Sequence, residues 1–350
     1  MVDYTLLKKL CTADGISGDE RAVRALIIDE IKDFADDIQI DNFGNLLVYK
    51  KGRERAKSKL MLSAHMDEVG MMVIDVTADG FLKFDEVGGI DRRVLLGKQV
   101  KVGKNGVNGV IGLKPIHLTK GDDKTAIPEL SEMYIDIGAD SREQALKQVR
   151  PGDSICYVSE FRETEFTVSA KAIDDRFGCY VMIEMIKSDL LYDTDFAFVV
   201  QEEVGLHGAT TAAYTLNPDF SLVLETTTAA DIPEIDLHKQ VCTLGEGAVI
   251  SVMDRRTIYD KDMVALAFLA AEQKGVKAQY KRAVAGGNDA GAIHQSRGGV
   301  RTLAISLACR YLHAPCCIAS KADCESMLTL AKEMAEQIAG GRLTDDSIGA

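Results

Sequence analysis

Acidic and histidine side chains occur where short apolar runs end, at distant points along the chain. Each of these runs is typical of a buried strand. In an open α/β sheet the carboxyl ends of the strands meet at one crevice, so residues far apart in sequence can surround one ligand. Two imidazoles and several carboxylates suit zinc, cobalt or manganese. The candidate residues for such a metal site are His65, Asp174, Glu202, Glu203, Glu225 and His313.

The His-x-Asp pair at His65 and Asp67 follows the apolar run 60–62. Alternate residues of an extended chain share a face, so both side chains should point to the same side. Asp67 is therefore predicted to orient His65 by a hydrogen bond, as metal-binding histidines usually require, and is placed with the catalytic residues. A single pair of this kind also occurs around ordinary polar histidines, so its significance depends on the other candidates.

Two adjacent aspartates, Asp174 and Asp175, stand at the start of a helical pattern. Either of them can simply cap the helix by accepting the free N–H groups of its first turn. We assign the cap to Asp175. Asp174, just ahead of it, is then placed to bridge two cations with its two carboxylate oxygens.

Glu202 and Glu203 close the strongly apolar run 196–200. Adjacent like charges at a buried strand end are costly unless a cation or a proton compensates them. Their side chains should diverge, so that one binds metal while the other exchanges protons. The competing interpretation is two exposed loop glutamates. Glu225 ends the run 222–224, and His313 follows the run 303–307 in a loop that Pro315 helps to fix.

A glycine-rich turn at residues 286–291 opens a short helical pattern. Its backbone N–H groups at Gly287 and the carboxylate of Asp289 are predicted to contact the substrate. A purely structural turn is the equally weighted alternative.

These residues require an α/β framework. Helical spacing occurs at 23–34, 177–186, 263–271 and 324–338, between the apolar runs named above. From residue 70 to 166 the pattern changes to short β-rich pieces separated by glycines. We therefore predict a discontinuous main domain, residues 1–69 plus 167–350, interrupted by an inserted β-barrel-like domain at 70–166. Within the insert, residues 118–126 are predicted to form an exposed loop.

Bulk composition excludes some classes of partner. The 350-residue chain has a formal net charge of -13 and a pI near 5.0, so nucleic acid and anionic membranes would repel it. The sequence shows no signal-peptide pattern and no span of transmembrane length. The eight cysteines include no C-x-x-C pair and mostly have apolar neighbours, which is typical of reduced, buried thiols. We expect a cytoplasmic protein.

Taken together, five motifs resemble the tetrahedral, or glutamyl/leucyl-type, dinuclear metallo-aminopeptidase family, some of whose members carry endoglucanase names. The likeness extends in order over nearly the whole chain. Segments 109–118 and 134–139 are similar to the dimerisation domain of that family, which implies a mixed-sheet catalytic domain with helices on both faces. The five motifs are HMDEVG at 65–70, IDDR at 173–176, QEEVG at 201–205, GGNDAG at 286–291 and RYLHAP at 310–315.

The resemblance implies two divalent metal ions per subunit. Zinc and cobalt are the first candidates, and manganese is a further one. One ion would be held by His65, Asp174 and Glu225, and the other by Asp174, Glu203 and His313, with Glu202 as the general base. Many members of the family have aspartate in place of Glu225 and threonine in place of Asn288, which leaves metal preference and substrate contacts open. Self-association through residues 70–166, as a dodecamer built from dimers, is also implied.

The expected function is removal of N-terminal residues from short peptides through a metal-bridged hydroxide. A glycoside hydrolase of endoglucanase type is the alternative enzyme, since paired carboxylates also cleave sugars. The chain has no tryptophan and few other aromatic residues that could stack on a sugar, which argues against a glycoside hydrolase. A non-catalytic assembly protein is the third hypothesis, which the full set of expected ligands disfavours.

Overall fold

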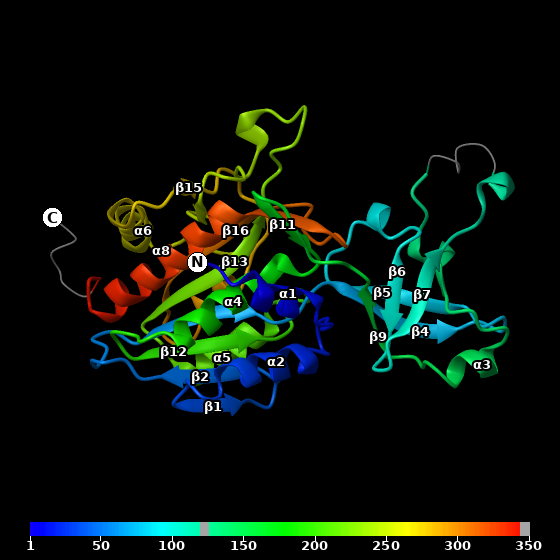
Figure 1. Ribbon diagram of the computed structural model, residues 1–350, viewed down its shortest axis with the longest axis horizontal. Helices are drawn as coiled ribbons and strands as arrows, with labels where there is room; N and C mark the ends of the chain where they lie inside the picture. The colour runs from blue at the N-terminus through cyan, green and yellow to red at the C-terminus, as the bar shows by residue number, and fades with distance from the viewer. Residues whose placement is uncertain (120–125, 344–350) are drawn as a thin grey trace.

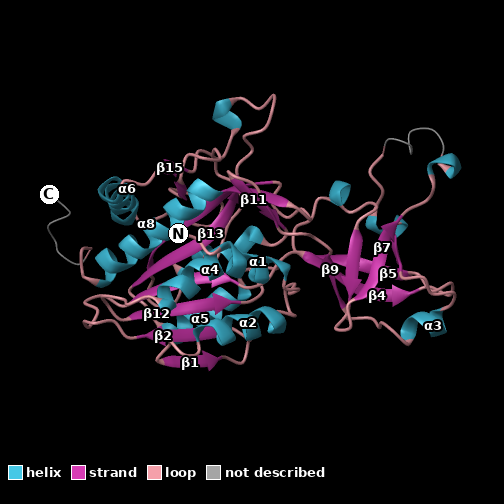
Figure 2. Cartoon of the chain, viewed as in Figure 1, coloured by secondary structure: helices cyan, strands magenta, loops and turns pink. Residues whose placement is uncertain are grey.

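Two separate β-structures organise the chain, a large sheet covered by helices and a small closed barrel (Figure 1). The computed structural model describes residues 1–119 and 126–343. Figure 2 shows α1, α2, α4, α5, α6 and α8 around the large sheet, while the barrel stands to one side of it together with α3. The predicted α/β class with a β-barrel-like insert is confirmed.

Four buried strands form the centre of the large sheet, in the order β12-β3-β13-β16, and all of them run parallel. The sheet has helices on both faces, so these strands are apolar along nearly their whole length rather than alternating. Because they are parallel, their carboxyl ends lie along one edge of the sheet. The strands are β3 (Leu60–His65), β12 (Thr194–Val199), β13 (Phe220–Thr228) and β16 (Arg301–Arg310).

Antiparallel strands extend the sheet on both sides of this centre, which makes it mixed. Beyond β12 lie β2 (Leu46–Lys50) and then β1 (Asp37–Ile40). Beyond β16 lie β17 (Cys317–Ser320), β11 (Thr167–Ala170) and β10 (Arg162–Glu163). β14 (Ala248–Ile250) also pairs with β16 and carries β15 (Ala278–Tyr280).

Helices cover both faces of the sheet. The helical patterns predicted at 177–186, 263–271 and 324–338 are confirmed, whereas the helix predicted at 23–34 ends at Ile31. α4 is buried on almost every side, because it packs on β3 and β13 and is covered in turn by α1, α2 and α8. α5 and α7 contact each other away from α4, and α6 packs on α8. The helices are α1 (Tyr4–Thr12), α2 (Arg21–Ile31), α4 (Ile173–Lys187), α5 (His207–Leu216), α6 (Lys261–Lys274), α7 (Ala290–Ile293) and α8 (Lys321–Ala339).

The barrel closes in the order β4-β5-β8-β7-β6-β9 around its own apolar core. Closure leaves no unpaired strand edge, which lets so small a β-unit remain stable. Its last strand ends at Tyr157, and β10 already belongs to the large sheet, so the barrel stops short of residue 166. Its elements are β4 (Gly70–Val76), β5 (Leu82–Val87), β6 (Gln99–Val102), β7 (Val107–Gly112), β8 (Tyr134–Asp136), α3 (Arg142–Leu146) and β9 (Ser154–Tyr157).

The cysteines are free thiols, as the sequence predicts, and seven of the eight are buried; only Cys316 is exposed. Among the described helices, none combines the length and the apolar character needed to cross a bilayer. The predicted exposed loop at 118–126 lies mostly outside the described residues.

Candidate metal centre

The candidate metal ligands come from the carboxyl ends of the parallel strands and from the start of α4. They line one cavity of about 380 Å³. His65 is the last residue of β3, and the Glu202–Glu203 pair follows β12. His313 lies in the turn after β16. Glu225 differs from the prediction, because β13 does not end there but continues to Thr228 in register with β16.

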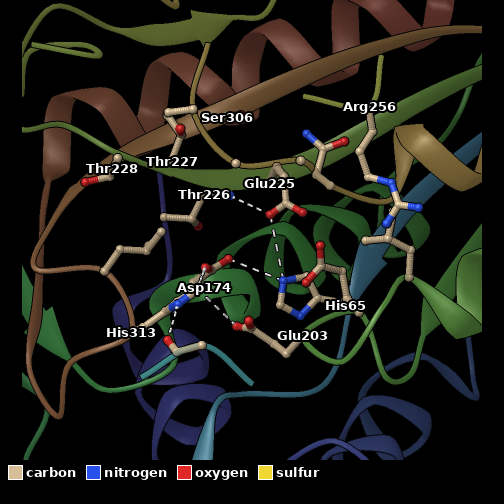
Figure 3. A pocket seen from close by; sticks show the side chains of 18 of the residues that line it. His65, Asp174, Glu203, Glu225, Thr226, Thr227, Thr228, Arg256, Ser306 and His313 are labelled. Carbon is tan, nitrogen blue, oxygen red and sulfur yellow. Dashed lines mark hydrogen bonds and ion pairs between the residues drawn. The ribbon is translucent and has the colours of Figure 1, made fainter. Parts of the chain in front are cut away.

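Asp174 lies between the two histidines, and each of its carboxylate oxygens faces one of them (Figure 3). Its Oδ1 is 3.3 Å from Nε2 of His65, and its Oδ2 is 3.4 Å from Nε2 of His313. Oε2 of Glu225 lies 3.7 Å from the first imidazole, and Oε1 of Glu203 lies 3.4 Å from the second. The five side chains thus form two groups of three with Asp174 in both, and in each group the donor atoms lie within 4.8 Å of one another.

The charge balance of this cavity is unfavourable without cations. Burial raises the pKa of Glu225 well above its ordinary value and that of Glu203 to about 7. Burial also acts on Asp174, but its contacts with His313 and His65 outweigh this and hold its pKa below the ordinary range. Two imidazole nitrogens and three carboxylates around a shared aspartate are a donor set that suits divalent transition ions. The residues therefore fit a pair of metal ions.

Asp175 forms the predicted helix cap. Its Oδ1 accepts a hydrogen bond from the backbone N–H of Gly178 at 3.0 Å. Asp174 and Asp175 both have non-helical backbone angles at the start of α4. The cap therefore occupies Asp175 and leaves Asp174 directed into the cavity.

The carboxylate of Asp67 holds the turn that carries the two glutamates. It accepts hydrogen bonds from the backbone N–H groups of Glu202 at 3.1 Å and Glu203 at 3.2 Å, and from the hydroxyl of Ser17 at 2.6 Å. Nδ1 of His65 is 3.0 Å from the backbone carbonyl of Asp67 but 3.6 Å from its carboxylate. The carbonyl is thus the closer partner of the imidazole, whereas the sequence pattern suggested the carboxylate.

The barrel also contributes to this site, which the sequence analysis did not anticipate. Nδ1 of His313 is 2.7 Å from the carbonyl oxygen of Gly89, in the loop that follows β5. His313 has a φ of 59°, an uncommon backbone conformation for a non-glycine residue. A Cβ atom on the adjacent Gly88 would lie 3.2 Å from Cβ of Glu203. This loop of the insert therefore packs against the site and orients one of its histidines.

The two predicted substrate contacts differ in their positions. Gly287 lines the cavity, and a Cβ atom there would lie only 3.0 Å from Cγ of Arg256. Asp289 is completely buried and is not among the residues that line the cavity, so direct contact with substrate is not supported for it. The polar residues of the lining that the sequence did not indicate are Thr226, Thr227, Thr228, Arg256, Lys281 and Ser306. They lie in β13, in β16 and in loops, and no motif marks them.

Comparison with known proteins gives a consistent result. Residues 44–330 match the family model described as M42 glutamyl aminopeptidase. The chain is 31% identical to the lysyl aminopeptidase of Pyrococcus furiosus, over 97% of this chain and 98% of that protein. It is also 31% identical to the glutamyl aminopeptidase of Lactococcus lactis subsp. cremoris, over 89% of each.

Solved structures agree with the sequence matches. A TET aminopeptidase from Thaumarchaeota archaeon SCGC AB-539-E09 superposes with a TM-score of 0.91 at 34% identity, covering 96% of both chains. The TET1 peptidase of Pyrococcus horikoshii, which can assemble into a tetrahedron or a large octahedral shell, gives a TM-score of 0.84 at 36% identity. That likeness covers 95% of this chain and 98% of the other.

Proposed function

The chain belongs to the M42 glutamyl aminopeptidase family, and we propose that this aminopeptidase works with two divalent ions per subunit, zinc or cobalt foremost and manganese third. One ion would be held by His65, Asp174 and Glu225. The other would be held by Asp174, Glu203 and His313.

The observation that carries this proposal is the position of Asp174. Its two carboxylate oxygens face different histidines at 3.3 and 3.4 Å, which is how a bridging ligand would be directed. A third group, formed by His65, Glu202 and Glu203, has donor atoms equally close together. It would use Glu202 as a ligand, however, and leave Asp174, whose two oxygens face both histidines, without a role.

When bound, the ions would polarise the scissile carbonyl and lower the pKa of the attacking water. Glu202 then accepts a proton from that water on its carboxylate and returns a proton to the leaving amine. Asp67 fixes the position of Glu202 through the backbone N–H at 3.1 Å. The backbone carbonyl of Asp67 and the carbonyl of Gly89 orient the two imidazoles.

The two alternative hypotheses are not favoured. A glycoside hydrolase needs two carboxylates and no histidine, yet both histidines stand within 4 Å of the carboxylates in this cavity. A purely structural protein would have no reason to gather three carboxylates and two imidazoles in one cavity.

We expect the metal-loaded protein to release single residues from the amino end of short peptides. A panel of aminoacyl p-nitroanilides and tripeptides, assayed with zinc, cobalt or manganese, tests this. Peptides with an acetylated amino end are the matched controls and should remain intact. Cleavage of the acetylated peptides, or no cleavage with any of the three metals, would contradict the proposed function.

We also propose that residues 70–166 mediate self-association, as a dodecamer built from dimers, in the cytoplasm. The connection that follows β7 in the insert carries exposed apolar side chains that a free monomer would leave in water. Ile116 and Leu118 are exposed to 72% and 53%. The ability of the Pyrococcus horikoshii relative to form closed shells supports this proposal.

Replacing Ile116 and Leu118 together by aspartate should lower the subunit number, because the charges would have to be buried in the contact. Multi-angle light scattering measures the mass. Ile258→Asp is the control, since Ile258 is exposed to 77% but lies outside the insert, and this variant should keep the mass of the parent. A double variant with the full mass of the parent would exclude this segment of the insert from the assembly.

A further inference from the structure

Four successive backbone N–H groups, those of residues 200–203 (the glutamate turn), donate to buried side chains from distant segments. The acceptors are Asn45 for residue 200, Glu20 for residue 201 and Asp67 for residues 202 and 203, at 3.0, 3.3, 3.1 and 3.2 Å. All three acceptors are at most 5% exposed. Side chains from three separate segments therefore define the turn that carries the general base and one candidate metal ligand.

Glu20 is the acceptor whose position needs an explanation. It stands directly before α2, where a side chain often caps the helix, yet its carboxylate makes no hydrogen bond with the first turn of α2. Its Oε1 accepts instead from the backbone N–H groups of Gly18 at 2.7 Å and Gln201 at 3.3 Å. Burial raises the pKa of Glu20, and Asp67 adds to this, whereas both N–H groups act against it. A carboxylate buried at this cost bonds a turn 181 residues away rather than its own helix.

Gln201 has a backbone conformation that depends on outside contacts. Its φ is 56°, in the left-handed region that non-glycine residues rarely adopt. Such a conformation persists only where the surrounding structure holds it. The N–H of Gln201 donates to Glu20, and its carbonyl accepts from the N–H of His207 at 3.1 Å. Loss of the contact with Glu20 would let this residue relax and would turn the carboxylate of Glu202, the next residue, away from its position.

Ser17 supports the same turn through Asp67. Its hydroxyl donates to Oδ2 of Asp67 at 2.6 Å, and that oxygen also accepts the N–H of Glu203. Ile16 forms a parallel bridge with Glu68, so the N-terminal segment runs beside the residues that follow β3. Residues 15–20 therefore reach the glutamate turn twice, directly through Glu20 and indirectly through Ser17.

We propose that Glu20 is a positioning residue of this aminopeptidase, which sets the direction of the Glu202 carboxylate by holding the N–H of Gln201. This inference rests on the proposed function and assigns to residues 15–20 a role in turnover. Glu20 does not line the cavity, so it acts through the turn and not on the substrate. Its removal should therefore affect kcat more than KM.

The test compares the metal-loaded parent with Glu20→Ala, Glu20→Leu and Glu20→Gln, on the aminoacyl p-nitroanilide that the parent cleaves fastest. Glu20→Ala should lower kcat by roughly 10- to 100-fold, the order expected when a catalytic group is displaced by about 1 Å. KM should change by less than about threefold. Glu20→Leu fills the space without accepting a hydrogen bond and should behave like Glu20→Ala, which keeps the test open if the alanine variant does not fold.

Glu20→Gln distinguishes the hydrogen bond from the charge. Its amide oxygen can still accept both N–H groups, so its kcat should stay within about threefold of the parent. A glutamine variant as slow as Glu20→Ala would overturn the inference. Metal content is measured on the same preparations, and a loss of kcat that excess metal fully restores would assign Glu20 to metal retention and overturn it as well.

Asp323→Ala is the matched control. Asp323 is likewise a buried carboxylate that accepts two backbone N–H groups, from Gly245 and Gly247, both at 2.7 Å, but it does not line the cavity or contact the glutamate turn. This variant should lose thermal stability and keep the kcat of the parent. An equal loss of kcat in Asp323→Ala, or a parental kcat in Glu20→Ala and Glu20→Leu, would contradict the role of Glu20.

Amide exchange separates failure of this inference from failure of the proposed function, because it needs no substrate. Hydrogen–deuterium exchange followed by mass spectrometry should be faster in peptides spanning residues 200–206 of Glu20→Ala and Glu20→Leu than in the parent, Glu20→Gln or Asp323→Ala. If the parent cleaves no substrate, the proposed function fails while this measurement still decides whether Glu20 holds the turn. Unchanged exchange in both Glu20→Ala and Glu20→Leu would show that it does not.

Discussion

Glu202→Gln should lower kcat by roughly 10²–10⁴-fold, the range typical of a lost general acid–base. The amide keeps the shape of the side chain but cannot accept a proton from the attacking water. The backbone N–H of residue 202 would still donate to Asp67, so the turn should keep its position. Metal content should remain that of the parent, and KM should change far less than kcat.

The control for this variant is Glu203→Gln, one residue further along the same turn. Glu203 lies 3.4 Å from His313 and is assigned to a metal, so its amide variant should lose metal as well as activity. Metal content and peptide hydrolysis are measured on the same preparations. Near-parental turnover in Glu202→Gln with a full metal complement would exclude it as the base, and loss of metal would identify Glu202 as a ligand.

Asp174→Ala should abolish binding of both ions and reduce activity by at least about 10³-fold, because the ions supply several kcal/mol of charge stabilisation. Replacement of the carboxylate by the methyl group of alanine removes both oxygens that face the two histidines. His313→Ala is the matched variant and should retain the ion held by His65 and Glu225. Elemental analysis after dialysis against dilute zinc gives the stoichiometry. Equal metal content in Asp174→Ala and the parent would exclude the bridging role.

The framework was predictable because its signals are local. Continuous apolar runs predicted β3, β12, β13 and β16, since strands covered on both faces carry no polar alternation. Helical spacing predicted α6 and α8, and short glycine-separated pieces predicted the barrel. Parallel strands place their carboxyl ends at one edge, so the gathering of His65 and Glu203 followed from the same pattern.

The features that could not be predicted depend on contacts between distant segments. Nothing in the sequence around Gly89 indicates that its carbonyl meets His313, because that contact depends on how the barrel sits against the sheet. The carboxylate of Asp67 accepts hydrogen bonds from backbone N–H groups that are more than a hundred residues away in the sequence. Glu225 appeared to end a strand because the threonines that follow it are polar, yet β13 continues through them. Lys281 follows a three-residue strand without any motif.

The most direct test of the two-metal account is anomalous diffraction from crystals of the chain grown with zinc. The account predicts two strong peaks in each subunit, one in contact with His65 and Glu225 and the other with Glu203 and His313, and both in contact with Asp174. A single peak, or a peak held by Glu202 together with His65 and Glu203, would contradict it.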